Sequence, residues 1–312
     1  MNFSRNIKSN KTFLVFNTAA FGDVLLCNSL VQNIKNIYPE SKVIFIADKN
    51  YRDAAFYQKG VDDVVIYDKK GLNKGILGLI KFIRSFPYKN ADYSIVTYKN
   101  FRNRLISKFL AKKTLHSKNI NKNFSMQEVH ANILAQITDS EIVNFPIKYE
   151  VEGDLPEKFR GFIDKTKKNV VFCGISKNLI KDFPIDLAVE LVNRLSSQGY
   201  NVILTGAGQK SKTFADELRQ NNCEFIDMVN KTTIVELAQL LKTVGLLISV
   251  DTGTMHLGYA VGAQTVCTFF EQNTKDYWGP SEKVYKNAKV FQNPTVDEIL
   301  NALNLPEFND NL

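Results

Sequence analysis

The sequence predicts an α/β protein made of two doubly wound units, each a parallel sheet with helices on both faces. Along most of the chain, short runs rich in β-branched and aromatic residues alternate with amphipathic segments, the pattern of parallel strands joined by crossover helices. The alternation lapses between residues 137 and 168, where prolines, glycines and charges break any regular period, so we place the linker there. The length of 312 residues also exceeds what one hydrophobic core usually fills.

The first unit is expected over residues 1–155. Its strands are the runs at residues 12–17, 42–47, 64–67 and 93–97. A helix should open near Asp23, because the apolar residues from Val24 to Ile34 recur on one side of a helical period. Further along, residues 99–122 contain many cations and no acidic residue, interleaved with apolar side chains. This spacing predicts an amphipathic basic helix.

The second unit is expected over residues 156–290. Its strands are the runs at residues 169–174, 201–205, 224–228, 246–250 and 265–270, and its clearest helices are at 184–197 and 233–244. The remaining segment, 291–312, holds one more helix at 295–303, which we expect to pack back toward the first unit. Ligands of such sheets bind beyond the carboxyl ends of the strands, so the loops that follow strands are where function is expected.

Composition narrows the class of protein. No apolar run is long enough to span a membrane and the first residues are polar, which predicts a cytoplasmic protein. The four cysteines, Cys27, Cys173, Cys223 and Cys267, are scattered without a CxxC pair, so neither a disulfide framework nor a zinc site is indicated. The net charge of +8 favours polyanionic partners: nucleic acid, anionic lipid or a phosphorylated glycan.

The first candidate segment is residues 17–23, between the first strand and its helix. Small residues and Gly22 allow a tight bend, after which Asp23 presents a carboxylate that could deprotonate a hydroxyl. The commoner role of aspartate at such a place is to cap the helix as its N-cap residue. The segment lacks the GxGxxG fingerprint, which argues against a nucleotide-dependent oxidoreductase.

The second candidate segment is residues 249–256, where an apolar strand gives way to a polar turn and a helix. Gly253 and the hydroxyls of Thr252 and Thr254 surround the helix start, and exposed amides at such a start bind phosphate. The alternative is a capped helix with His256 packed nearby.

Cations make up the third and fourth candidates. Lys177 and Lys181, in the loop over residues 174–184, could reach a diphosphate, although exposed lysines commonly have no specific role. The basic segment comprises Lys99, Arg102, Arg104, Lys108, Lys112, Lys113, Lys118 and Lys122. It suits anionic headgroups or a phosphorylated acceptor, with a solvated helix face or nucleic-acid binding as alternatives. The histidines show no ligand spacing and neither Asp-x-Asp nor HExxH occurs, so the sequence does not favour a metal-assisted mechanism.

Together these segments resemble the lipopolysaccharide heptosyltransferases and their relatives in glycosyltransferase family 9. The likeness extends over residues 12–280, and its anchors are Phe-Gly-Asp-Val-Leu-Leu at 21–26 and Val-Asp-Thr-Gly-Thr-Met-His-Leu at 250–257. It implies a GT-B fold, with two Rossmann-like domains facing a central cleft. It also implies an inverting, metal-independent transfer, most commonly of heptose from ADP-heptose to a Kdo-containing lipid A core.

The resemblance also implies roles for individual residues. Asp23 corresponds to the general base and Lys181 to the cation that holds the donor diphosphate. The donor-binding positions are Ser176, Lys177, Thr232, Asp251, Thr252, Gly253, Thr254 and His256, and the expected acceptor-binding positions are Arg102 and Arg104. No metal or other cofactor is expected. The chain departs from the family pattern where Phe183 replaces Trp, Lys177 replaces a hydroxyl and Glu271-Gln272 replaces Gly-Pro, and these departures bear on the donor sugar.

The expected partners are a nucleotide-sugar donor and an anionic lipid A/Kdo-type glycolipid acceptor, with peripheral contact at the inner face of the bacterial inner membrane and no nucleic acid. Two alternatives stay open. One is transfer of a hexose or an N-acetylhexosamine by the same fold. The other is a non-catalytic basic module that binds anionic lipid or nucleic acid.

Overall fold

The computed structural model describes residues 10–98, 100–117 and 123–304. The chain divides into two compact units between Tyr149 and Glu150, a few residues before the expected boundary at 155/156. Tyr149 is tied to the first unit by a β-bridge to Gln58 and by its hydroxyl, which donates to the carbonyl of Asp53 at 3.1 Å. Glu152 already belongs to the second unit, because its carbonyl accepts from the side chain of Gln239 at 2.9 Å.

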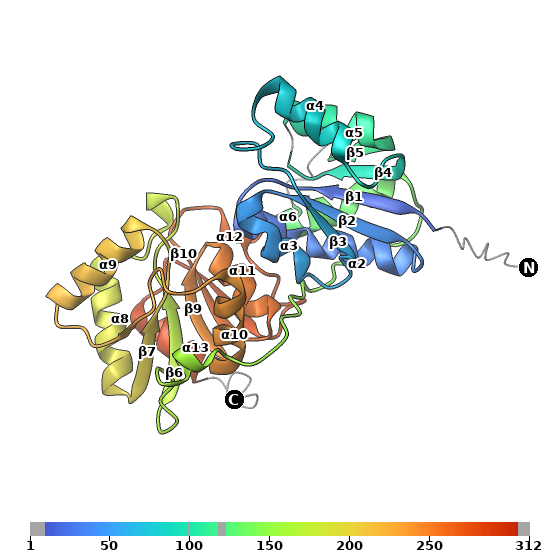
Figure 1. Ribbon diagram of the computed structural model, residues 1–312. Helices are drawn as coiled ribbons and strands as arrows, with labels where there is room; N and C mark the ends of the chain where they lie inside the picture. The colour runs from blue at the N-terminus through green and yellow to red at the C-terminus, as the bar shows by residue number, and fades with distance from the viewer. Residues whose placement is uncertain (1–9, 99, 118–122, 305–312) are drawn as a thin grey trace, which may run out of the picture. The chain divides into compact units, whose positions relative to one another are not determined.

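The first unit is a five-stranded parallel sheet in the order β3-β2-β1-β4-β5. Its strands are β1 (Thr12–Phe16), β2 (Lys42–Ala47), β3 (Asp63–Ile66), β4 (Ala91–Val96) and β5 (Ala111–His116). Its helices are α1 (Phe21–Leu26), α2 (Asn28–Ile37), α3 (Arg52–Phe56), α4 (Gly75–Ser85), α5 (Phe101–Leu110) and α6 (Met126–Ala131). Figure 1 shows α4 and α5 on one face of this sheet and α2 and α6 on the other.

The core on the α4 and α5 face explains why these helices form where they do. Phe82 and Phe86 from the region of α4 and Ile106 and Leu110 from α5 are buried against strand residues such as Leu14. Each helix therefore contributes one apolar side to the sheet, and burial of that surface, at roughly 25 cal/mol per Å², stabilises it.

The basic segment does not form one helix, which corrects the sequence expectation. Helix α5 ends at Leu110, and residues 111–116 pair with β4 as the edge strand β5. Lys112 and Lys113 of this strand are exposed and Leu115 is buried, as an edge strand tolerates, so pairing with β4 overrides the helical periodicity. Lys112 forms an ion pair with Asp92 at 2.9 Å. Lys99, Lys118 and Lys122 lie outside the described residues.

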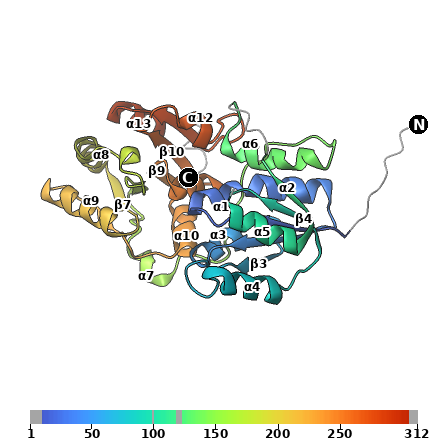
Figure 2. The same ribbon diagram turned by 90° about the horizontal axis from the view of Figure 1, so that it is seen from above.

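The second unit is a six-stranded parallel sheet in the order β11-β10-β9-β6-β7-β8. Its strands are β6 (Lys168–Cys173), β7 (Tyr200–Leu204), β8 (Ile226–Asp227), β9 (Leu246–Val250), β10 (Gln264–Phe269) and β11 (Ala288–Gln292). Its helices are α7 (Glu157–Arg160), α8 (Ile185–Ser197), α9 (Gln209–Gln220), α10 (Ile234–Val244), α11 (Gly253–Ala260), α12 (Lys275–Trp278) and α13 (Val296–Leu303). Helices α8 and α9 pack together, as Figure 2 shows. Strand β11, at the edge, was not predicted.

Helix α13 packs on α8 and β10 of the second unit, and its expected packing toward the first unit stays a prediction. Its buried side includes Ile299 and Leu303, and Asp297 accepts from Arg194 of α8 at 2.6 Å. An apolar side and one charge pair therefore place this helix within its own unit.

The two α/β units confirm the predicted fold class. No helix in residues 10–98, 100–117 or 123–304 is both long enough and apolar enough for a membrane crossing.

Candidate active site

Each sheet has one point at which neighbouring strands send their helices in opposite directions. In the first unit this point lies between β1 and β4, and in the second between β6 and β9. A crevice for ligands opens at the carboxyl ends of such strands. The loops after these four strands contain most of the residues predicted to act.

An ion pair joins the loops after β6 and β9 at the switch point of the second unit. Lys181 lies in a short 3-10 turn, Leu179–Lys181, and its Nζ is 2.6 Å from Oδ2 of Asp251, the residue that follows β9. The side chain of Asp251 is only 6% exposed and that of Lys181 is 18% exposed. Burial raises the pKa of the Asp251 carboxyl, and the nearby ammonium of Lys181 partly opposes that rise.

Two further groups surround the Lys181 ammonium. Oε2 of Glu271, in the loop after β10, lies 3.5 Å from Nζ. The centroid of the Trp278 ring, at the end of α12, lies 5.6 Å from the same Nζ. The ammonium thus faces two carboxylates and an aromatic ring. If a diphosphate displaced one of these carboxylates, the Lys181 ammonium would already be positioned to bind it.

The loop after β6 is braced by a second ion pair. Oδ2 of Asp182 is 2.6 Å from Nζ of Lys210 on α9, while Oδ1 of Asp182 accepts from the backbone amide of Ser176 at 2.8 Å. Lys210 also donates to the carbonyl of Ser176 at 2.7 Å. These contacts close the loop on itself, so that Ser176, Asp182 and the neighbouring Lys181 hold fixed relative positions.

An aromatic cluster packs around Phe183, near the end of the same loop. Phe183 is buried, with its ring against Phe172 and Phe270 at centroid distances of 5.2 and 5.0 Å. At Gly174, which precedes the loop, an added Cβ would lie 2.7 Å from the ring of Phe214. The loop can therefore leave β6 at this point only because Gly174 has no side chain.

The start of α11 presents polar groups beside Asp251. Thr252 is the N-cap residue in extended conformation, and its hydroxyl makes no capping hydrogen bond. Gly253 begins the helix and Thr254 is buried. The first amides of a helix have no intrahelical acceptor, so this turn can offer donors to an anionic ligand.

His256 is the most deeply enclosed of the predicted donor-binding residues. Its Nδ1 lies 2.5 Å from the hydroxyl of Tyr259, one turn further along α11. Burial, assisted by the positive charge of Lys181, lowers the pKa of His256 to about 3. The imidazole is therefore neutral near pH 7 and packs within the unit.

We expect acidification to destabilise the protein through His256 and through His130, whose pKa burial lowers to about 4 from an ordinary 6.5. Below pH 6.5 these two histidines are protonated in the unfolded chain but remain neutral in the folded chain until the pH approaches their folded pKa. The free energy of unfolding therefore falls as pH falls. Each histidine contributes up to about 1.4 kcal/mol per pH unit until its folded pKa is reached. Denaturant titrations between pH 7 and pH 5 should show a shallower pH slope for His256→Gln than for the parent chain. Equal slopes would contradict the buried, neutral state of His256.

The first unit places Asp23 in the first turn of α1. The helix begins at Phe21 with Ala20 as N-cap, so Asp23 is the third helical residue and not the N-cap that the alternative interpretation assumed. Its Oδ2 accepts from the backbone amide of Ala20 at 3.3 Å, and its side chain is half-buried. The carboxylate thus helps to close the helix start while it keeps access to solvent.

The turn before Asp23 is held by buried polar contacts. The side chain of Asn17 donates to the carbonyl of Asp23 at 3.2 Å and accepts from the amide of Ala19 at 2.9 Å. Behind it, Sγ of Cys27 lies 3.6 Å from Nδ1 of His130. Burial raises the pKa of Cys27 to about 12, so this thiol stays protonated and serves packing.

The remaining predicted residues belong to several different elements of the two units. Arg102 donates to the backbone carbonyls of Asn73 and Gly75 at 2.6 and 2.7 Å, so it fixes the start of α4. Arg104 and Lys177 are exposed, and Thr232 lies half-buried in the loop before α10. The structure therefore brings Lys181, Asp251 and Ser176 into one loop cluster.

The sequence analysis missed four contributors: Asp182, Lys210, Glu271 as an ion-pair partner, and Trp278. Glu271 was noticed only as a departure from the family pattern, although its position directly after an apolar strand was an available signal. Among the described residues, no group of three or more His, Cys, Asp or Glu side chains could hold a metal ion.

Known proteins resemble this chain in sequence and in fold. The sequence model of "Glycosyltransferase family 9 (heptosyltransferase)" matches residues 96–299. A similar protein is the lipopolysaccharide core heptosyltransferase OpsX of Haemophilus influenzae, 24% identical over 282 residues, which cover 84% of this chain and 80% of that protein.

Solved structures share the fold. A family 9 glycosyltransferase from Veillonella parvula superposes with a TM-score of 0.83 at 18% identity and covers 95% of this chain and 97% of its own. The E. coli ADP-heptose LPS heptosyltransferase II superposes with a TM-score of 0.76 at 16% identity, with coverage of 96% and 100%. These likenesses confirm the two Rossmann-like units of the expected GT-B fold. Because the family match covers more than half of the sequence, the chain belongs to glycosyltransferase family 9, the heptosyltransferases.

Proposed function

We propose that this glycosyltransferase moves heptose from ADP-heptose to a sugar of the lipopolysaccharide core, with inversion at the anomeric carbon. The observation that carries the proposal is the buried Lys181–Asp251 ion pair at the switch point of the second sheet. Its ammonium suits a diphosphate and its carboxylate suits sugar hydroxyls. The names of the similar OpsX and E. coli proteins support the core acceptor and the ADP-heptose donor respectively.

In the proposed reaction Asp23 takes the proton from the acceptor hydroxyl, whose oxygen forms a bond to the anomeric carbon of the donor. The bond from that carbon to the diphosphate breaks, and its electron pair leaves with the diphosphate oxygen. Lys181 and the first amides of α11 stabilise the charge that develops there. Asp251 holds the sugar hydroxyls, and Ser176, Lys177, Thr252, Gly253 and Thr254 line the phosphate side.

We expect full turnover in EDTA, because Lys181 and helix amides supply the positive charge that a divalent ion supplies elsewhere. The measurement is nucleoside diphosphate release with and without chelator in otherwise identical buffer. A strict requirement for added Mg²⁺ would overturn the metal-independent mechanism.

A second candidate, transfer of a hexose or an N-acetylhexosamine, is favoured by Glu271. Its carboxylate lies 3.5 Å from Lys181, at the place where many family members have Gly-Pro. An added carboxylate beside the sugar-binding Asp251 changes which hydroxyls can be held. Nucleotide release from ADP-heptose, UDP-hexoses and UDP-N-acetylhexosamines, each with truncated lipopolysaccharide, separates the two candidates.

The proposed acceptor is an anionic glycolipid of lipid A and Kdo type, so the proposed place of action is the cytoplasmic face of the inner membrane. Arg102 and Arg104 were expected to bind this acceptor. Arg104 is exposed and is the better of the two candidates, since Arg102 donates to backbone carbonyls. A non-catalytic role in binding nucleic acid would instead show as salt-sensitive RNA binding without turnover of any nucleotide sugar.

A further inference from the structure

Helix α4 carries aliphatic side chains on both of its sides. Toward the sheet, Gly78 and Phe82 are buried, and Leu79 and Ile83 pack against the core of the first unit. The opposite side is also aliphatic over its first two turns. Ile76 is 75% exposed, Leu77 82% and Ile80 40%, and Leu72 in the preceding turn is 79% exposed. A helix on a protein surface ordinarily presents polar residues there, and a contiguous apolar patch marks an interaction site.

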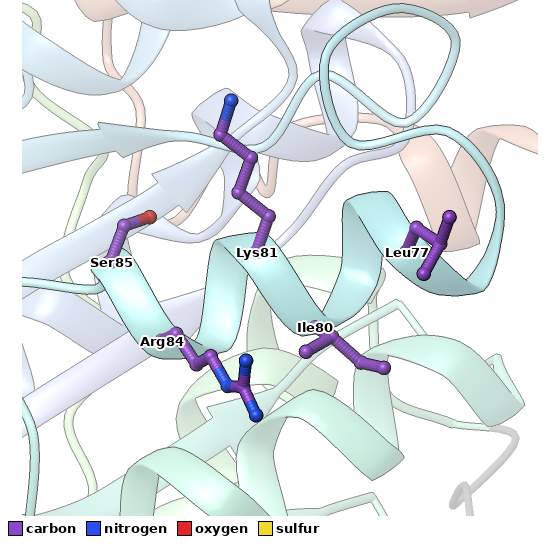
Figure 3. Close-up of a pocket in the computed structure, with 5 residues that line it drawn as sticks. All are labelled: Leu77, Ile80, Lys81, Arg84 and Ser85. Atoms are coloured by element: carbon purple, nitrogen blue, oxygen red, sulfur yellow. The ribbon is translucent and has the colours of Figure 1, made fainter.

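Cations complete this outer side. Lys81 and Arg84 follow the aliphatic residues on the same side of α4, and Lys74 precedes them, all of them exposed. Residues 69–91 contain no aspartate or glutamate. Leu77, Ile80, Lys81, Arg84 and Ser85 line a depression of about 460 Å³, from which Figure 3 shows the Lys81 and Arg84 side chains extending away from the helix. Aliphatic surface flanked by Lys74, Lys81 and Arg84 complements the anionic headgroups and acyl chains of a lipid bilayer.

The neighbouring helix extends the same chemistry. Helix α5 packs against α4, and it exposes Phe101 and Phe109 together with Arg104 and Lys108. Arg102 of α5 holds the start of α4 through its two carbonyl contacts. The outer side of α4 is therefore presented by a folded, anchored helix.

We propose that Leu72, Ile76, Leu77, Ile80, Lys81 and Arg84 form a membrane-docking surface for anionic phospholipid. The aliphatic side chains enter the headgroup and acyl boundary, while Lys81 and Arg84 lie among the lipid phosphates. The proposal deepens the proposed function, since it names the surface by which the enzyme reaches a membrane-borne acceptor. It also replaces the continuous basic helix over residues 99–122 that the sequence predicted for this contact.

The test is flotation of the full chain with vesicles of phosphatidylcholine, with and without phosphatidylglycerol. The parent chain should float only with the anionic vesicles. Lys81→Gln with Arg84→Gln should weaken partitioning roughly 30-fold, because each cation near an anionic surface contributes on the order of 1 kcal/mol. Ile76→Ser with Leu77→Ser and Ile80→Ser should weaken it at least about tenfold, because buried aliphatic area drives insertion. The matched control, Lys165→Gln with Lys212→Gln, removes the same charge from the second unit and should float like the parent.

A second measurement guards against variants that fold poorly. The chain has one tryptophan, Trp278, so Leu77→Trp adds a reporter at an exposed position. The fluorescence of the added tryptophan is the emission of Leu77→Trp minus that of the parent chain. It should shift to shorter wavelength with anionic vesicles only.

Either of two results would overturn the docking surface: parent and α4 variants that float alike, or a Leu77→Trp spectrum unchanged by vesicles. Turnover with a deacylated, water-soluble acceptor should be equal in the parent and in the α4 variants. If vesicle binding follows the prediction but no nucleotide sugar is turned over, the proposed function fails while the docking surface stands. If nucleotide sugar is turned over normally but the parent chain does not bind vesicles, the docking surface fails while the proposed function stands.

Discussion

Asp23→Asn should lower kcat by roughly 10²–10⁴-fold and leave the affinity for the nucleotide nearly unchanged. An amide of the same shape cannot take the proton of an acceptor hydroxyl. Its oxygen can still accept from the amide of Ala20, as Oδ2 of Asp23 does at 3.3 Å, so the start of α1 is preserved. Steady-state release of nucleoside diphosphate measures the first effect, and calorimetric titration with ADP measures the second.

A matched variant separates chemistry from charge. Asp53→Asn changes another aspartate in the first turn of a helix of the same unit, one that pairs with the exposed Arg52. Its kcat should remain that of the parent. Retained activity in Asp23→Asn would remove Asp23 from the role of base and leave the mechanism without its proton acceptor.

The second large effect is expected at Lys181. Lys181→Ala should reduce kcat/KM by roughly 10²–10³-fold, the usual loss when one preorganised donor to a developing oxyanion is removed. ADP affinity should also fall, because the same ammonium contacts the ground-state diphosphate in the proposed complex. Lys181→Arg retains the charge and should recover part of the loss. The control Lys212→Ala removes an exposed lysine of α9 and should leave both quantities unchanged.

A structural explanation of a Lys181→Ala defect can be distinguished from a chemical one. The substitution leaves Asp251 buried without its cation, which destabilises the fold, so thermal unfolding should shift downward. Asp251→Asn in the same background removes that uncompensated charge and should restore stability without restoring the affinity for ADP. If the double variant also recovered ADP affinity, Lys181 would be a partner of Asp251 only and would have no contact with the diphosphate.

The sequence by itself determined the fold class, the positions of most strands and the two anchor motifs. This was possible because the signals are local. Strands β2 and β9 match the predicted runs at residues 42–47 and 246–250 in full, since both strands are buried along nearly their whole length and contain few polar residues. Helices α8 and α10 carry one apolar side each, which a helical period reveals without any partner.

Only the tertiary structure decided the rest, because the remaining choices depend on residues distant in sequence. Pairing with β4 turned residues 111–116 into an edge strand, where the local period favoured a helix. Contact with α8 and β10 assigned α13 to the second unit. The Asp182–Lys210 brace joins positions far apart in the chain. The contact between Glu271 and Lys181 also joins distant positions. Neither contact can be predicted from the local spacing of residues. Charge and shape at the site arise where the ends of parallel strands meet, and that meeting exists only after the sheet has formed.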